Sequence, residues 1–315
     1  MSAPRLSVVL IVYDMVSQAM NTIQSLLPPY QQGVGTEEYE VIVVENRSAR
    51  TLDPAALAGF GPQLRYELRD EPGVSPGPAI NAGLALARGR MVGVLIDGAR
   101  MLSPGVIANV LRAEAIATDP VVAVPGYQLG PEPHNRSEAH NVDRDRALLA
   151  GIDWPAAGYR LFEVSSFSEA NRNGVFRPFM ECNALFAPAR LLAEIGGAHP
   201  GFDQPGGGAL NLWLFYQLVS HPDATYVVLP GEGSFHQVHG GVTTRPQADK
   251  EALYESFSRR LDEILGHPDK VMRIPPLLRG TLPPEFHDHL LFSARSFHKK
   301  VERDRRNAAT GKSSP

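Results

Sequence analysis

The sequence has 315 residues, of which 43% are hydrophobic, enough to bury a substantial core in one large domain or two smaller ones. Its 30 Lys and Arg residues nearly balance 34 Asp and Glu residues, and the net charge of -4 offers no general electrostatic footprint for nucleic acid. The single cysteine, Cys182, cannot form an intrachain disulfide, so a reducing, cytoplasmic compartment is expected. Composition therefore indicates a globular protein without a nucleic-acid partner.

The first part of the chain has the pattern of a βαβ unit. Residues 6–13 (LSVVLIVY) and 39–45 (YEVIVVE) are continuous β-branched runs, as expected for parallel strands buried on both faces. The first run is far shorter than the roughly 20 residues that span a bilayer, so it predicts a strand. Between the two runs, residues 17–27 carry apolar side chains at helical spacing and end at two prolines.

The alternation of strands and helices continues to residue 124. The predicted elements are a strand at 64–68, a helix at 78–87, a strand at 91–96, a helix at 104–117 and a strand at 121–124. Glu45 ends one predicted strand, and Asp97 follows another. Because ligands bind at the carboxyl ends of the strands in open α/β sheets, we expect both carboxylates at one rim.

Residues 130–177 differ in character, since they are polar and only weakly periodic, which is typical of an inserted lid or acceptor loop. The elements predicted after this segment are a strand at 179–186, a helix at 188–195, a glycine-rich turn at 206–208, a helix at 209–219 and a strand at 225–229. Amphipathic helices at about 247–265 and 284–306 close the chain, and the residues from about 307 are expected to be disordered.

Four segments, in this order, resemble glycosyltransferase family 2, whose members have the GT-A fold. LSVVLIVYD resembles the opening strand of the family, VIVVENRS its nucleotide-contacting VVDDGS strand end, AINAGLALARGRMVGVLIDGA its A-x-N-x-G … A-x-G … D-x-D block, and IGGAHPGFDQ its GGFDE turn. The likeness covers about residues 5–245. It implies an α/β fold with a Rossmann-like, mostly parallel central sheet flanked by helices, and a C-terminal helical extension.

The resemblance implies a GT-A domain over residues 1–245, a helical extension at 246–306 and a tail at 307–315. Residues 1–125 would form the nucleotide-sugar-binding half, and residues 126–245 the acceptor half with its inserted loop at 130–177. The implied activity is transfer of a sugar from a nucleotide-diphosphate donor to the hydroxyl of a glycan or other acceptor, in bacterial-type polysaccharide or glycoconjugate synthesis.

The same resemblance implies a set of donor-binding residues. Tyr13 would pack near the nucleotide base, Glu45 would accept hydrogen bonds from the base or ribose, and Gly73 and Asn81 match the segment that approaches the nucleotide. Each has a structural alternative that the sequence leaves open. Tyr13 could cap a core strand, Glu45 could belong to a surface turn, and Asn81 could be a residue of the helix surface.

A divalent cation, Mn²⁺ or Mg²⁺, is implied by the family's D-x-D motif, of which Asp97 is kept here while Arg100 follows in place of a second carboxylate. The segment GEGSFHQVHGG places His239 at the late histidine that some GT-A enzymes present to the metal, with His236 as the second choice. Arg100 could instead pair with the diphosphate directly, or be a solvated loop cation.

The family's acidic E-D-x-D-L segment is missing, because Gly208 and Ala209 occupy its first positions. Glu181 is the favoured general base, since a charged residue inside an apolar strand needs a partner or a task, although it could form an edge-strand salt bridge. Asp203, from the turn that resembles GGFDE, is the substitute, although such turn aspartates often cap the next helix.

Two other functions remain open. A catalytically silent GT-A domain could bind nucleotide or glycan as a partner subunit. A nucleotidyltransferase uses a similar sheet, but it would carry a glycine- and lysine-rich phosphate loop, and this loop is missing after the first strand.

The last helix pairs apolar with basic residues, a pattern that fits a peripheral membrane contact or a homodimer interface. Glu302 and Asp304 dilute its charge, which favours simple packing on the domain.

Overall fold

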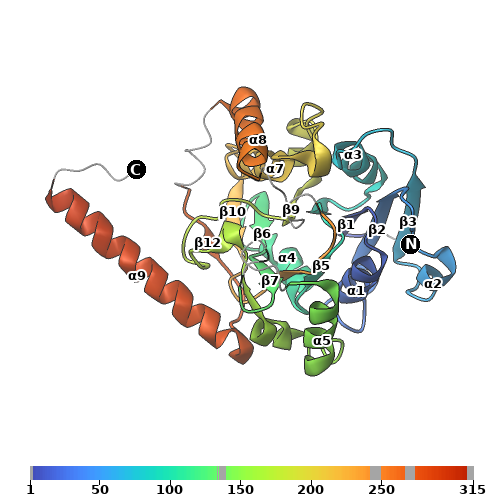
Figure 1. Cartoon of the computed structure of the whole chain (residues 1–315), viewed down its shortest axis with the longest axis horizontal. Helices are drawn as coiled ribbons and strands as arrows, with labels where there is room; N and C mark the ends of the chain where they lie inside the picture. The colour runs from blue at the N-terminus through green and yellow to red at the C-terminus, as the bar shows by residue number, and fades with distance from the viewer. Residues whose placement is uncertain (1–2, 133, 135–139, 242–249, 267–273, 311–315) are drawn as a thin grey trace.

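The protein is a mixed α/β structure with a mostly parallel central sheet flanked by helices and a long C-terminal helix (Figure 1). This computed structural model describes residues 3–132, 134, 140–241, 250–266 and 274–310. The eight strands of the central sheet lie in the order β12-β10-β6-β9-β4-β1-β2-β3. Their bounds are β1 Leu6–Val12, β2 Tyr39–Asn46, β3 Leu64–Arg69, β4 Met91–Leu95, β6 Pro120–Ala123, β9 Ala184–Pro188, β10 Thr225–Val228 and β12 Leu277–Leu278.

The predicted βαβ unit forms the centre of this sheet. β1 pairs in parallel with β2 from Leu6 opposite Tyr39 to Val12 opposite Glu45, and with β4 on its other side. Every residue of β1 and β2 is buried because helices cover both faces of the sheet. β9 is antiparallel to both β4 and β6, so the two halves expected from the sequence share one sheet.

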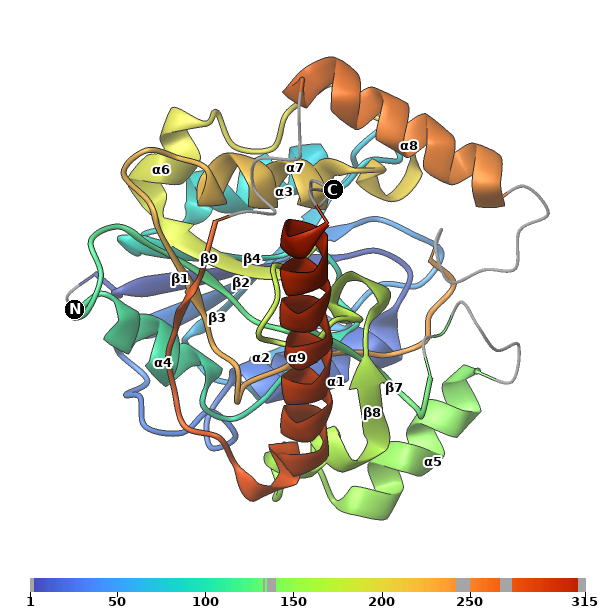
Figure 2. The ribbon, with the colours of Figure 1, turned by 90° about the vertical axis from the view of Figure 1, so that its left-hand side faces the viewer.

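Helices form a layer on each side of the sheet, as Figure 2 shows edge-on. One face is covered by α1 Val16–Leu26, α2 Pro54–Ala58 and α4 Val106–Ala113. The other face is covered by α3 Gly77–Leu86, α6 Ala189–Glu194 and α7 Leu210–Val219, and α8 Lys250–Leu265 packs onto α7. The apolar spacing in α1 directs Ala19, Ile23 and Leu26 into the core, as its sequence predicts.

A second sheet of four short strands, in the order β5-β11-β7-β8, stands beside the first. Its strands are β5 Arg100–Leu102, β7 Gly126–Leu129, β8 Ser165–Phe167 and β11 Ser234–His236. None of them is predicted by the sequence pattern. An aromatic cluster packs on this sheet, in which the ring of Tyr127 lies 4.8 Å from Phe167 and 5.3 Å from Phe235 between centroids.

The segment expected to be an inserted loop has secondary structure of its own in its described part. It contains α5 Val142–Ile152, β8 and the 3-10 helices Gly158–Val164 and Glu169–Asn171. The side chain of Asn141 caps α5 by accepting a hydrogen bond of 2.9 Å from the backbone N–H of Arg144. Buried Leu149 and Phe162 then join the aromatic cluster of the second sheet.

One strand prediction is wrong in a way that matters for the site. The sequence favours a strand at 179–186 with Glu181 inside it, whereas β9 begins at Ala184. Its neighbour β4 ends at Leu95, which pairs with Ala184, so there is no strand for the preceding residues to pair with. Glu181 therefore lies in the connecting segment before β9.

The C-terminal helix α9 His287–Ala309 follows the 3-10 helix Pro284–Phe286. Phe286 is fully buried and Ser293 is the last buried residue, so the expected packing on the domain holds only for the first part of α9, and its far end extends outward (Figure 1). The helix includes three residues of the expected tail, and residues 311–315 lie outside the described part. Among the described helices, none has the length and apolarity needed to cross a membrane.

Candidate active site

A cavity of about 1070 Å³ lies at the carboxyl ends of β1, β2 and β4. Tyr13 lines it after β1, Asn46 at the end of β2, and Asp97 after β4. Further walls come from the start of α7 and from α8, through Tyr254 and Phe257. This is the edge where ligands bind in open α/β sheets, and the volume is at the upper end of ordinary ligand sites, which reach about 1,000 Å³.

The turn after β4 fixes the orientation of Asp97. The backbone N–H of Ala99 donates a hydrogen bond of 3.0 Å to Oδ1 of Asp97, which leaves Oδ2 facing inward. Gly98 is needed between them, because a Cβ there would lie 2.9 Å from the carbonyl oxygen of Ile11. Close contact between the turn and the end of β1 therefore sets the position of the carboxylate.

Pairing of the two short strands brings the histidines to Asp97. β11 runs antiparallel to β5 with His236 opposite Arg100, and the N–H of Gln237 donates a 2.9 Å hydrogen bond to the carbonyl of Ala99. Nε2 of His236 then lies 2.9 Å from Oδ2 of Asp97, and Nε2 of His239 lies 3.4 Å from the same oxygen. The two Nε2 atoms are 3.1 Å apart.

The electrostatics favour an ionised aspartate beside a neutral imidazole. Burial opposes ionisation of Asp97, but the charges and hydrogen bonds of His239 and His236 outweigh it and hold the pKa of the carboxyl well below its usual range. Burial, assisted by the Arg100 cation, lowers the pKa of His236 to about 4. A carboxylate and a neutral imidazole are the protonation states in which these side chains bind metal.

The three ligand atoms fit one face of an octahedral metal site. Neighbouring ligands of an octahedral ion with bonds of about 2.1 Å are roughly 3 Å apart. The distances among Asp97, His236 and His239 are 2.9, 3.1 and 3.4 Å. A set of one oxygen and two nitrogen donors suits Mn²⁺ and zinc-like ions. The residue types and their spacing are therefore compatible with a divalent cation.

Arg100 lies next to Asp97 and also lines the cavity. It is 7% exposed, its Nε is 3.7 Å from Oδ2 of Asp97, and its Nε and Nη1 have no hydrogen-bond partner among the described residues. The solvated loop cation considered from the sequence is thus not what the structure contains. A buried guanidinium with unpaired donors is suited to an anionic ligand such as a diphosphate.

The residues expected to bind the nucleotide are separated by the structure. Tyr13 is 59% exposed and lines the cavity, as does Gly73. Glu45 is fully buried and turned away, because its carboxylate accepts hydrogen bonds from the Tyr66 hydroxyl at 2.6 Å and the Leu52 N–H at 3.0 Å. Asn81 does not reach the cavity either.

Asn81 has a structural task instead. Its side chain accepts a hydrogen bond of 2.8 Å from the N–H of Ala198 and donates one of 3.0 Å to the carbonyl of the same residue. It thereby fastens the glycine turn after α6 to helix α3. The surface turn considered for Glu45 does not fit its complete burial, whereas the helix-surface position considered for Asn81 fits its exposure.

The two candidate bases also differ in position. Glu181 lines the cavity, and its carboxylate accepts hydrogen bonds from the amides of Asn211 at 2.7 Å and Asn183 at 3.1 Å. Asp203 is exposed and lies outside the described residues that line the cavity, because its neighbour Phe202 turns into the core. Only Glu181 is brought to the site.

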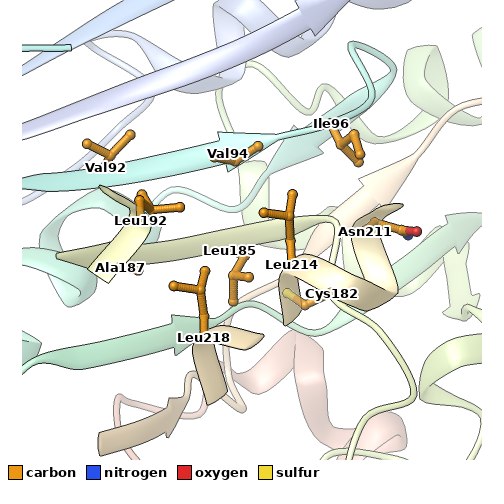
Figure 3. Close-up of a pocket in the computed structure, with 10 residues that line it drawn as sticks. All are labelled: Val92, Val94, Ile96, Cys182, Leu185, Ala187, Leu192, Asn211, Leu214 and Leu218. Atoms are coloured by element: carbon orange, nitrogen blue, oxygen red, sulfur yellow. The ribbon is translucent and has the colours of Figure 1, made fainter. Parts of the chain in front are cut away.

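Figure 3 shows a small apolar pocket where side chains of β4, β9, α6 and α7 meet. The gap between them is about 10 Å³, which is hardly room for one water molecule and none for a ligand. Ile96 and Asn211 border both this gap and the large cavity. Asn211 therefore stands at the boundary, with its amide reaching the carboxylate of Glu181.

Several cavity residues are missed by sequence reasoning. Gln128 comes from β7, a strand that the sequence does not predict, and His134 comes from the segment after it, where the polar sequence predicts only a loop. Tyr254 and Phe257 belong to α8, which the sequence predicts as a helical extension and not as a cavity wall. The amphipathic pattern of α8 signals a buried face, but it does not say what that face covers.

The sequence matches no known protein-family profile and no curated protein. Solved structures resemble its fold at low identity. S. aureus TarS aligns at 11% identity and a TM-score of 0.48 over 82% of this chain and 43% of its own. TarS 1-349 in complex with UDP-GlcNAc aligns at 15% identity and 0.49, over 85% of this chain and 70% of its own.

The mannosyltransferase PcManGT from Pyrobaculum calidifontis, in complex with GDP-Man and Mn²⁺, aligns at 17% identity and a TM-score of 0.47, over 98% of this chain and 80% of its own. The present chain spans less than half the length of the first TarS structure. With TM-scores below 0.5, these similarities assign neither substrate nor residue roles to it.

Proposed function

We propose that the chain is a glycosyltransferase of the GT-A type, related to family 2, that uses a nucleotide-diphosphate sugar. The observation that carries this proposal is the meeting of Asp97, His236 and His239 at the carboxyl edge of a parallel sheet, inside a cavity of about 1070 Å³. A metal centre next to a cavity of that size suits a nucleoside diphosphate with an attached sugar.

The donor diphosphate would lie against the Asp97 group. Asp97, His236 and His239 would hold Mn²⁺ or Mg²⁺, which offsets the negative charge that develops on the leaving diphosphate. Arg100 adds a second positive charge from below. Tyr13 and Gly73, at another part of the same cavity, would contact the nucleoside end of the donor.

Glu181 would act as the general base. It would take the proton from the acceptor hydroxyl as that oxygen bonds to the anomeric carbon, while the bond from that carbon to the nucleoside diphosphate breaks. Asn183 and Asn211 hold the carboxylate in one orientation. Tyr254 and Phe257 of α8 form an aromatic wall of the kind that packs on sugar rings and excludes water.

The competing proposal is a catalytically silent domain that binds nucleotide or glycan for a partner subunit. It is favoured by the hydrogen bonds from two amides to Glu181, which already occupy the carboxylate that would have to accept a proton from the acceptor. It is also favoured by Gly208 and Ala209, which supply no carboxylate at the edge of the cavity. Binding without turnover is its signature.

A donor-hydrolysis screen separates the two proposals. UDP-, GDP-, dTDP- and ADP-sugars are incubated with the protein, with and without Mn²⁺, and the released nucleoside diphosphate is measured. A glycosyltransferase releases it from at least one donor, and Asp97→Asn abolishes the release. A protein that binds a donor but releases nothing, with or without added glycans, is the silent domain.

The proposed setting is cytoplasmic, in bacterial-type polysaccharide or glycoconjugate synthesis, with a glycan as the hydroxyl acceptor. α9 exposes Leu291, Phe292 and Phe297, which are 40–46% accessible. A peripheral membrane contact or a homodimer would use this row of side chains.

A further inference from the structure

A second group of metal-binding side chains lies outside the Asp97 centre. His134, His140 and Asp145 each offer a ligand atom, and the three atoms lie within 4.8 Å of one another. The side chains come from the segment after β7 and from the first turn of α5. All three residues are more than nine-tenths buried, with exposures of 7%, 9% and 4%.

Polar atoms of this group have no partner in the described part of the chain. They are Nδ1 of His134, both ring nitrogens of His140, and Oδ1 of Asp145. Buried polar atoms in folded proteins are almost always hydrogen-bonded, so four orphaned atoms in one small volume need an explanation. A cation between them would satisfy one atom of each residue at once.

Outer contacts occupy one polar atom of His134 and one of Asp145, and leave the other polar atom of each without a partner among the described residues. Nε2 of His134 is 3.0 Å from the carbonyl oxygen of Leu129, which can only accept, so this nitrogen carries the proton and Nδ1 keeps its lone pair. Oδ2 of Asp145 accepts a 2.5 Å hydrogen bond from the N–H of Val238, which leaves Oδ1 available. Ligating histidines typically make such a bond from the other ring nitrogen.

The backbone also makes room for His140. Gly130 has φ +102°, and a Cβ there would lie 2.2 Å from Cε1 of the His140 ring. Only glycine accepts both this backbone conformation and this contact. The position of the ring is thus built into the local fold.

We propose that His134, through Nδ1, together with His140 and Asp145 binds a structural zinc ion, separate from the Asp97 centre. Two imidazoles and one carboxylate are common zinc ligands, and three protein ligands leave a fourth position for water. Ligand atoms around tetrahedral zinc are roughly 3.4 Å apart, which follows from bonds of 2.0–2.1 Å. The candidate ligand atoms of the three residues lie within 4.8 Å of one another, so their side chains would close in on the ion to reach this spacing.

The zinc ion would also hold in place the segment that carries His236 and His239 of the Asp97 centre. Val238, which donates to Asp145, stands between His236 and His239 in the chain. The ring of His134 also lies 5.5 Å from that of His236 between centroids. Zinc at the second group would thus fix the segment that carries the histidines of the first, which makes its ligands positioning residues.

A third cluster of possible metal ligands, on the protein surface, is unsuited to binding a metal. Glu194, His221 and Asp223 also lie within 4.8 Å of one another, but Glu194 is exposed and Arg190 pairs with both carboxylates at 2.9 and 3.3 Å. These ligands are already neutralised by an arginine and open to water. His221 therefore provides a matched control histidine.

The test is zinc stoichiometry in an Asp97→Ala background, which removes the donor-metal centre. The chelated full-length protein is equilibrated with Zn²⁺, desalted and analysed for metal per chain. We expect about one ion for Asp97→Ala, about one for Asp97→Ala with His221→Ala, and none for Asp97→Ala with His140→Ala. Because Asp97 is absent throughout, the result is independent of whether the chain is a glycosyltransferase.

If the double variant does not fold, thermal unfolding is measured instead on single variants that keep Asp97. Zn²⁺ should raise the Tm of wild type and of His221→Ala, and should raise it less in His140→Gln, which keeps a polar side chain of similar size. The proposal is overturned if Asp97→Ala retains no zinc. An equal zinc content, or an equal Tm shift, with and without His140 overturns it as well.

Discussion

The side-chain amide of Asn211 donates a hydrogen bond of 2.7 Å to the carboxylate of Glu181, and so links the first turn of α7 to the segment before β9. In the family that the sequence resembles, an acidic residue is expected at the start of this helix. Here the amide of Asn211 stands there and holds the carboxylate of Glu181, which comes from the segment before β9.

Replacing Glu181 by glutamine should lower turnover with little change in donor affinity. Loss of a general base typically reduces the rate 10²- to 10⁴-fold, about 3–5 kcal/mol of activation free energy. Turnover and donor binding are measured side by side for Glu181→Gln and for the control Asp203→Asn, whose side chain is exposed outside the cavity. Full turnover in Glu181→Gln would remove this residue from the reaction.

Secondary structure is predicted best from the sequence where burial restricts a segment to apolar residues. The continuous apolar runs of β1 and β2 and the helical spacing of α1 give the βαβ unit within one or two residues. The three-residue strands β5 and β11 are not predicted. They exist because they pair with each other, and so short a segment has no periodicity of its own.

The site is predicted only in part, for two physical reasons. Asp97, His236 and His239 are named because their segments resemble metal-binding motifs of family 2, although the strand pairing that joins them is tertiary. Glu45 lies at the expected strand end, but its side chain turns toward Tyr66, and a sequence does not specify that rotamer. Glu181 reaches the cavity although the strand expected around it does not form.

The buried carboxyl group of Glu232 should make stability depend on pH. It is 1% exposed and accepts hydrogen bonds from Ser103 at 2.5 Å, and from Asn109 and Tyr159 at 3.0 Å each. Burial raises its pKa above the ordinary value of 4.5, and these hydrogen bonds offset only part of the effect. The folded state therefore holds the proton more tightly than the unfolded state does.

It follows that the contribution of Glu232 to the free energy of unfolding is largest below pH 4.5 and falls as the pH rises through its folded pKa. Urea denaturation of wild type and Glu232→Gln at pH 4.5, 6 and 7.5 measures this. The stability of wild type relative to the variant should decrease with rising pH. A relative stability that increases with pH would contradict the assignment.

Phe286 should anchor the C-terminal helix. It is fully buried, and its ring lies 5.3 Å from that of Phe162 between centroids. Phe286→Ala should lower the free energy of unfolding by roughly 3–5 kcal/mol, as large-to-small core substitutions do. Phe297→Ala is the control, because that side chain is 45% exposed and its loss should change stability by no more than about 0.5 kcal/mol. Equal effects of the two substitutions in denaturant titrations would show that Phe286 is no anchor.

The central claim is that a nucleoside diphosphate binds at the Asp97 group with a divalent cation. Calorimetric titration of UDP, GDP, dTDP and ADP, with and without Mn²⁺ or Mg²⁺, tests it most directly. At least one nucleotide should bind wild type about tenfold more tightly with metal, a gain of about 1.4 kcal/mol, and Asp97→Ala and His239→Ala should lose that gain. Failure of every nucleotide to bind, or the same metal dependence in both variants as in wild type, would contradict the account.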